Sequence, residues 1–224
     1  MIAWSYSSWA MFEECPRRFK AIVLDKEFER GSSPALVRGD EIHRVIADYL
    51  REPSGDPPKY LPPRARRMIA QLIARAGKPK VELKLAVNEK MEPVPYFDPS
   101  VVLRGNVDAV WIDQTTKDAY VFDWKTGKSE ANPLQLDLMC VLVSAHVVND
   151  IERFHAMFYY LENERNNYAL PERSADELRR IFTRFYTEAT ELYRTSTFEP
   201  TPGPHCRWCP VTTCPHNPNT VPTL

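Results

Sequence analysis

The sequence lacks several features that would assign it to a specialised class of protein. It has no apolar run long enough to span a bilayer, and its first residues lack a charged segment followed by an apolar one. It also has no internal repeat, no low-complexity tract and no Walker loop. The net charge is only −1, so any nucleic-acid surface must be a local patch. These absences predict a cytoplasmic protein that does not associate with membranes.

The amino-acid composition is that of an ordinary globular protein. The chain has 224 residues, of which 43% are hydrophobic and 26% charged, enough for one domain with a sizeable core. It has five cysteines. In a reducing compartment these favour metal ligation over disulfides.

Residues 103–125 predict a β-hairpin, because two runs rich in β-branched and aromatic residues flank a polar turn. If the turn is symmetric, Asp108 lies opposite Asp123, and Lys125 shares their face because side chains alternate along a strand. Opposed carboxylates repel, and charges among apolar neighbours are costly unless paired or metal-bound. A divalent cation with oxygen ligands is the simplest explanation. The alternative is an acidic face exposed to solvent.

Periodicity and capping residues predict the other elements. The first helix starts near Ser5, Ser7 or Ser8 and is broken at Pro16. The last helix is capped by Ser174, with a core stripe of Leu178, Ile181, Phe185 and Leu192. Further helices are expected at 35–50, 64–77 and 134–148, and further strands at 81–87 and 153–161. This order predicts an α/β fold with a mixed central β-sheet flanked by helices.

Several polar residues stand out within these elements. Gly39 and His43 lie one turn apart on one helical stripe, so Gly39 is expected to allow a close approach. Glu82 faces away from its apolar strand neighbours. A basic trio early in the chain could meet phosphates or simply form a solvated helix face: Arg17, Arg18 and Lys20.

The tail contains a C-x2-C-x4-C cluster of Cys206, Cys209 and Cys214. Three cysteines need a fourth ligand to complete a tetrahedral zinc site or an iron–sulfur cluster. The candidates are Cys15 and Cys140, or, for zinc, His205 and His216. Cys140 lies in an apolar helix and is more typical of a core residue, so Cys15 is favoured. Ligation by Cys15 would join the two ends of the chain.

Five ordered motifs together resemble those of the PD-(D/E)XK nuclease superfamily, in particular its RecB-like branch. They are FEECPRRFK, the Gly39-x3-His43 helix, RGNVDAV, VFDWKTGK and the helix with Gln135. The cysteine triplet with an early cysteine is similar to iron–sulfur members, namely the AddB nuclease domain and the CRISPR-associated adaptation exonucleases. The resemblance extends from Ser7 to Cys214, and implies a restriction-endonuclease-like core.

The resemblance implies roles for particular residues. Ligands of Mg²⁺ or Mn²⁺ would be His43, Asp108, Asp123, the Trp124 carbonyl and, less regularly, Glu82. Lys125 would position water or stabilise charge on the phosphate, and Gln135 would support the site. The usual Gln-x3-Tyr pattern is broken here by Met139, which weakens any aromatic role at that position.

The resemblance also implies an activity and its cofactors. We expect a metal-dependent DNA exonuclease that acts on single-stranded or duplex ends, in recombination and repair or in phage or mobile-element DNA processing. A [4Fe–4S] cluster would bind Cys15, Cys206, Cys209 and Cys214, with structural Zn²⁺ as the alternative. Expected partners are a helicase or a recombinase, or further copies of the chain. The rival hypothesis is a non-catalytic DNA-end-binding or scaffold module.

The domain organisation expected on this basis is a single nuclease domain over residues 1–224. It divides into a helical part (1–78), a nuclease core (79–196) and a cysteine-rich tail (197–224).

Overall fold

The structure is a computed structural model that describes residues 2–29, 31, 33–53, 56–127, 132–147 and 150–220. Residue 148 of the predicted helix and the last residues of the tail therefore lie outside the described residues.

The chain begins with a broken helical segment. Helix α1 (Tyr6–Glu14) starts at Ser5, whose side chain and that of Ser8 form a reciprocal capping box. The helix stops at Cys15, which has an extended conformation, and Pro16 opens α2 (Pro16–Phe19), followed by a π-helix, η1 (Lys20–Leu24). The predicted break at Pro16 is confirmed, and it leaves Cys15 at the junction of two helices.

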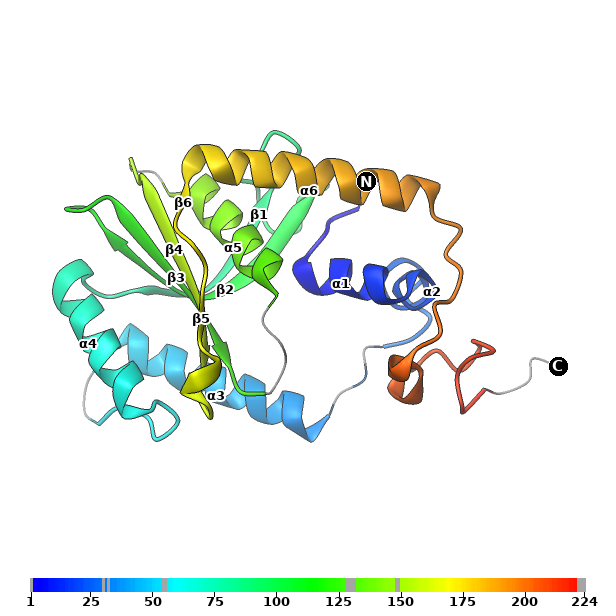
Figure 1. The fold of residues 1–224 in the computed structure, drawn as a ribbon, viewed down its shortest axis with the longest axis horizontal. Coiled ribbons are helices and arrows are strands. Elements are labelled where there is room, and N and C mark those ends of the chain that lie inside the picture. Colours follow the sequence, from blue (N-terminus) through cyan, green and yellow to red (C-terminus); the bar gives the residue numbers. More distant parts are fainter. Residues whose placement is uncertain are drawn as a thin grey trace.

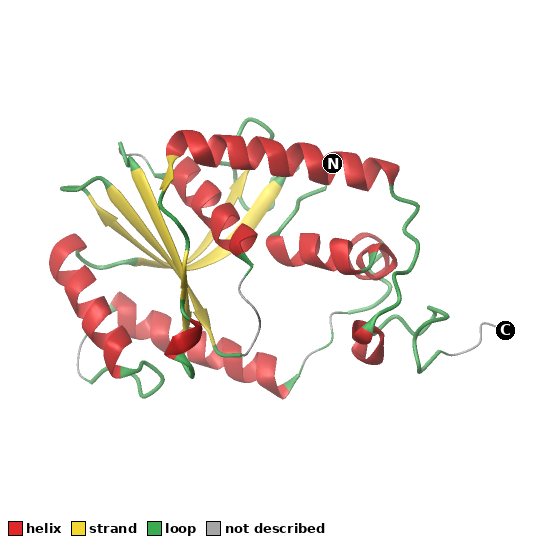
Figure 2. Cartoon of the chain, in the orientation of Figure 1, coloured by secondary structure: helices red, strands yellow, loops and turns green. Residues whose placement is uncertain are grey.

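A six-stranded mixed sheet forms the centre of the molecule (Figures 1 and 2). Its main order is β1-β2-β3-β4-β5, and β6 also pairs with β4. Strands β3 and β4 are parallel, while the other pairs are antiparallel. The strands are β1 (Lys80–Val87), β2 (Leu103–Asp113), β3 (Asp118–Lys125), β4 (Arg153–Tyr160), β5 (Tyr168–Ala169) and β6 (Arg173–Ser174). Neither two-residue strand was predicted, because such short segments carry no periodic pattern.

Helices cover both faces of the sheet (Figure 1). Helices α3 (Pro34–Arg51) and α4 (Pro63–Ala76) pack on one face through a core that includes Trp111, Phe122 and Trp124. Helices α5 (Pro133–His146) and α6 (Ala175–Thr195) cover the other face. There the larger core also takes in α1 and η1. These layers confirm the predicted α/β class with a mixed central sheet.

The core stripe of α6 differs in part from the prediction. Ser174 caps the helix as expected, in a capping box with Glu177. The buried residues are Leu178, Phe182, Phe185 and Ala189, whereas Ile181 is half-buried and Leu192 is 50% exposed. The last turns of α6 run beyond α5 toward α1, where the ring of Tyr193 packs on Trp4 instead (Figure 1).

After α6 the chain descends beside α2 to a short helix, η3 (Pro204–Trp208), so the tail lies against the N-terminal segment (Figure 1). The remaining helical turn is η2 (Glu164–Asn166). Among the described residues, no helix is both long and apolar enough to span a membrane.

Candidate active site

The predicted register of the hairpin is confirmed. Ile112 pairs with Ala119 and Val110 with Val121, and continuing this register places Asp108 opposite Asp123. The ladder between β2 and β3 ends at Ala109, just before these acids. Both carboxylates are buried, so their mutual repulsion is only weakly screened by solvent.

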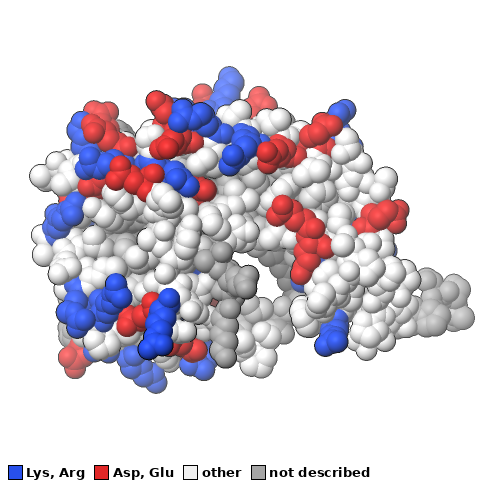
Figure 3. Space-filling view, viewed as in Figure 1, with Lys and Arg blue, Asp and Glu red and all other residues white. Residues whose placement is uncertain are grey.

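Beyond the end of that ladder, β2 and β3 are no longer paired with each other. Leu103, at the start of β2, pairs with Val87 on one edge and forms a bridge with Trp4 on the other, where β3 would otherwise continue. The edge of β2 between Leu103 and Asp108 therefore faces a gap bounded by β3 and the N-terminal segment. The surface is hollowed between the sheet and the α1–α2 segment (Figure 3).

The third carboxylate of the site comes from β1. The register on either side, with Val81 opposite Ala109 and Leu83 opposite Val107, places Glu82 opposite Asp108. Glu82 has a left-handed backbone with φ +51° in the middle of a strand. For a residue other than glycine this conformation costs on the order of 1–3 kcal/mol and is most often found at functional sites.

Next to Asp108, the alternation of β2 side chains between the two faces of the sheet shifts by one residue. Val107 packs in the core under α5, as do Val110 and Ile112, whereas Ala109 packs under α3 and α4. The strict alternation of side chains predicted for the hairpin strands, which would place Val107 on the same face as Ala109, is therefore wrong at this point. Because the register is the same on both sides, the strand bends without an inserted residue. The bend places Asp108 between the two helical layers.

Helix α3 supplies His43, whose Nδ1 lies 3.3 Å from Oδ2 of Asp108. One turn earlier, a Cβ built on Gly39 would lie 3.1 Å from Oγ1 of Thr126. The predicted close approach at Gly39 is therefore to the end of β3. His43, Glu82 and Asp108 each offer a ligand atom within 4.8 Å of the others, the one such group of three among the described residues.

Asp123 is held by a different set of contacts. Its Oδ1 accepts a hydrogen bond of 2.9 Å from Nε2 of Gln135, at the start of α5. Its Oδ2 lies 2.7 Å from Nζ of Lys125 but, among the described residues, has no hydrogen-bond donor in good alignment. Lys125 also donates to Oε1 of Gln135 at 3.2 Å and lies 4.5 Å from the centre of the Phe158 ring. The ammonium group is therefore fixed over the end of β3.

The remaining carboxylate contact comes from the main chain. The Trp124 amide donates to Oδ2 of Asp108 at 2.8 Å, and the Trp124 side chain is buried between the sheet and α3–α4. The Trp124 amide thus holds one oxygen of Asp108 in place.

The pKa values follow from this concentration of acids. Burial, and then the negative charge of Asp108, raise the pKa of Asp123 to about 6. The same two causes raise the pKa of Glu82. Burial disfavours the charged form of His43, but the hydrogen bond and charge of Asp108, with the charges of Asp123 and Glu82, raise its pKa to about 9.

These observations fit a divalent cation. Three acids face one another across adjacent strands, and one buried oxygen of Asp123 lacks an aligned donor. Carboxylate oxygens are the preferred ligands of Mg²⁺ and suit Mn²⁺. Glu82, which the resemblance implied only as a less regular metal ligand, lies within the three-ligand group. Its left-handed backbone gives no signal in the sequence, because the strand pattern around it is regular.

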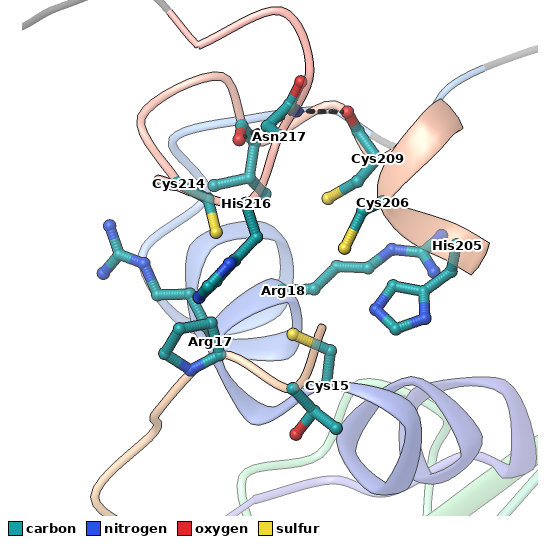
Figure 4. Close-up of a pocket in the computed structure, with 12 residues that line it drawn as sticks. Cys15, Arg17, Arg18, His205, Cys206, Cys209, Cys214, His216 and Asn217 are labelled. Atoms are coloured by element: carbon teal, nitrogen blue, oxygen red, sulfur yellow. Dashed lines mark hydrogen bonds between the residues drawn. The ribbon is translucent and has the colours of Figure 1, made fainter. Parts of the chain in front are cut away.

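The four cysteines selected from the sequence also come together. The sulfur atoms of Cys15, Cys206, Cys209 and Cys214 point toward a common space between α1, α2 and the tail (Figure 4). His205 and His216 line the same pocket. Cys140 is fully buried within α5, as expected for a core residue.

The basic trio lies next to this pocket. Arg17 and Arg18 line it, and Arg18 also pairs with Glu14 at 2.6 Å. Lys20 pairs with Asp25 at 2.5 Å. Two of the three cations thus have acidic partners within their own helical segment.

A mixed central sheet flanked by helices, with carboxylates on adjacent strands, is consistent with a restriction-endonuclease-like fold. The sequence matches the profile of the PD-(D/E)XK nuclease superfamily over residues 3–215, so the chain belongs to this superfamily.

Among curated proteins, none matches the sequence significantly. Two solved structures are similar. The protein SSO0001 has a TM-score of 0.45 and 18% identity, with 91% of this chain and 82% of that chain covered. A candidate exonuclease from Eubacterium rectale has a TM-score of 0.49 and 12% identity, with coverages of 98% and 89%. Neither likeness is strong enough to carry an argument about function.

Proposed function

We propose that this protein is a Mg²⁺- or Mn²⁺-dependent DNA exonuclease of the RecB-like branch. The observation that carries the proposal is the row of Glu82, Asp108 and Asp123 across three strands, with Lys125 at its end. A binding module gains nothing from three acids that repel both one another and a phosphate. A catalytic metal site requires such an arrangement.

The metal ligands in this proposal are His43, Asp108, Asp123 and the Trp124 carbonyl, with Glu82 as a further ligand. When bound, the cation lowers the pKa of water and neutralises charge that builds on the scissile phosphate. The remaining tasks are carried out by the side chains. Asp108 is oriented by the Trp124 amide, and His43 fixes its Oδ2 from the side of α3.

Lys125 is the proposed catalytic cation. Its ammonium group stabilises negative charge on the phosphate and orients the attacking water, because ammonium donors strengthen as negative charge develops. Gln135 bridges Lys125 and Asp123, and so holds the cation and the acid at a fixed separation. Met139 is buried and lines a cavity beside Gln135, so it contributes packing where other family members place a tyrosine.

We propose further that Cys15, Cys206, Cys209 and Cys214 hold a [4Fe–4S] cluster. The four sulfurs face one common space, and four thiolates are the usual ligands of such a cluster. Structural Zn²⁺ is the alternative occupant, because it also binds four thiolates.

In this proposal the cluster is structural, because it joins the two ends of the chain. Arg17, Arg18 and Lys20 lie beside it and are proposed to contact DNA. The biological setting that we propose is DNA recombination and repair, or phage and mobile-element DNA processing. A helicase, a recombinase or a second copy of the chain would be its partner.

The proposed activity is tested with end-labelled linear DNA and closed circular DNA of the same sequence, each with Mn²⁺ or with EDTA. We expect release of short labelled products from linear DNA in Mn²⁺ only, with circular DNA left intact. Nicking of the circle would show endonuclease action. DNA binding without any cleavage would instead support a scaffold module and contradict the proposal.

A further inference from the structure

A second cavity, of about 240 Å³, opens beside the candidate active site. It is lined by the N-terminal segment (Ser5, Tyr6), the start of β2 (Arg104, Asn106) and the start of α5 (Gln135). Gln135 belongs to both sites, since it also binds Asp123. The cavity lies along the part of β2 that is not paired with β3 and that leads to Asp108.

Tyr96 and Arg104 line this cavity, and the ring of Phe97 contacts both of them from outside the lining. The rings of Tyr96 and Phe97 lie edge to face, with centroids 5.1 Å apart. The guanidinium carbon of Arg104 lies 5.2 Å from the Tyr96 ring centre and 5.7 Å from that of Phe97. Phe97 is 80% exposed, the highest value among the exposed large hydrophobic residues described. Such an aromatic side chain has no role in the core and is available to a ligand.

The charge of the cavity is opposite to that of the metal site. None of its described lining residues is acidic, and Arg104 makes no ion pair within the described ranges. The neighbouring acid, Asp98, accepts hydrogen bonds from the amide and hydroxyl of Ser100 in its own loop. The cavity therefore favours an anion, held by a cation that the aromatic rings keep in place.

The distance between the two sites suits one substrate strand. Arg104 and Asp108 are four residues apart on β2, so their Cα atoms are at most about 14 Å apart. An exposed aromatic ring with an adjacent cation is the arrangement that binds unpaired bases and their phosphates. Within a duplex, an interior base has both faces covered by its neighbours and offers none to Phe97.

We propose that this cavity and the exposed Phe97 ring beside it form a single-strand subsite, in which an unpaired base stacks on Phe97 and the adjoining phosphate binds Arg104. The inference rests on the proposed nuclease function and specifies its substrate as an unpaired DNA end. A duplex end would have to fray before its strand reached the carboxylates.

The test measures dissociation constants in EDTA for a single-stranded oligonucleotide and for a blunt duplex of the same length. We expect Phe97→Ala to weaken single-strand binding about tenfold, the effect of one lost stacking contact. Duplex binding should change little, and Phe97→Tyr should retain wild-type affinity. Leu192→Ala is the matched control, because it removes another exposed apolar side chain that does not line the cavity.

Salt dependence separates the two contacts. Arg104→Ala should reduce the slope of log affinity against log salt by about 0.7, the value for one lost phosphate contact on a single strand. Phe97→Ala should leave that slope unchanged. The subsite is refuted if Phe97→Ala binds single strands as tightly as Leu192→Ala does, or if it weakens duplex binding equally.

Cleavage is assayed separately, with Asp108→Asn as reference. If cleavage depends on Asp108 but Phe97→Ala binds DNA as tightly as the wild type, the subsite alone is refuted. Loss of single-strand binding in Phe97→Ala, with no cleavage by the wild type, would support the subsite and refute the proposed catalytic function.

Discussion

The carboxylate site and the cysteine pocket are built in different ways. The carboxylates lie on adjacent strands, and sheet register alone brings Glu82, Asp108 and Asp123 together. The cysteine pocket joins Cys15 to a tail that begins about 190 residues later, and its four sulfurs face an open space. The first site is formed by the fold. The second, in our proposal, holds part of the fold together through its bound group.

The two sites therefore differ in what a substitution should change. Losing a carboxylate from this site relieves repulsion between like charges and removes a ligand needed for the chemistry. Losing a cysteine removes a link that closes a loop nearly as long as the chain. Substitutions at the carboxylate site should reduce activity without reducing stability. Substitutions in the cysteine pocket should reduce stability first, and activity as a consequence.

The largest expected effect is on cleavage. Lys125→Ala removes the cation that stabilises charge on the phosphate, and the rate should fall on the order of 10²- to 10³-fold. DNA binding should stay largely intact, because the basic side chains elsewhere remain. Single-turnover cleavage and binding in EDTA measure the two properties. Retained cleavage in the variant would contradict the role assigned to Lys125.

The next effect is on stability. Cys206→Ala should lose the iron and its visible absorbance. A link that closes so long a loop contributes on the order of 4–5 kcal/mol by chain entropy. At this size that corresponds to a fall of about 8–20 °C in Tm.

The matched control is Cys140→Ala, which removes the one cysteine that lies outside the pocket. It should keep the absorbance and lose little stability. A Cys206→Ala protein that melts like Cys140→Ala would show that the pocket does not stabilise the fold.

The fold was largely predictable from local signals. Turn symmetry predicted the hairpin register, and Ser174 predicted the start of α6. Glu82 could not be recognised as strained, because its φ depends on how β1 and β2 bend together. The pairing of Trp4 with Leu103 and the cation–π contacts of Arg104 were missed for a related reason. Such contacts depend on tertiary placement, which sequence periodicity does not encode.

A smaller effect is expected at Gly39, which links α3 to the end of β3. Gly39→Ala places a Cβ about 3.1 Å from Oγ1 of Thr126 and should push His43 away from Asp108. We expect about a tenfold loss of kcat, since small displacements at a reacting centre are costly. Tm should stay level or rise, because alanine favours a helix by up to about 1 kcal/mol.

The double variant sharpens this prediction. Adding Thr126→Ala removes the atom that the new methyl group would meet, so activity should return toward that of Thr126→Ala alone. No recovery in the double variant would show that Gly39 acts through some other contact.

The smallest effect is a pH dependence of stability in the metal-free protein. The pKa of His43 in the folded state, about 9, lies above its ordinary value, so protonation stabilises the fold. That contribution is complete below about pH 6.5 and is lost as the pH rises through 9. It amounts to at most about 3 kcal/mol.

Urea unfolding in EDTA at pH 6.5 and pH 9 measures this loss, and His43→Gln is the control that should lack it. Mg²⁺ should reduce the dependence, because a cation at Asp108 opposes protonation of His43. An equal loss of stability in His43→Gln would assign the effect to another group.

The most direct test of the whole account is the cleavage rate of Asp108→Asn on end-labelled DNA in Mn²⁺, measured beside the wild type. Asparagine keeps the size of the side chain, and its amide oxygen can still accept the hydrogen bond from the Trp124 amide, so the fold should be retained. We predict that cleavage is lost while Tm stays within a few degrees of the wild type. Cleavage at the wild-type rate would show that the carboxylate site is not the nuclease centre.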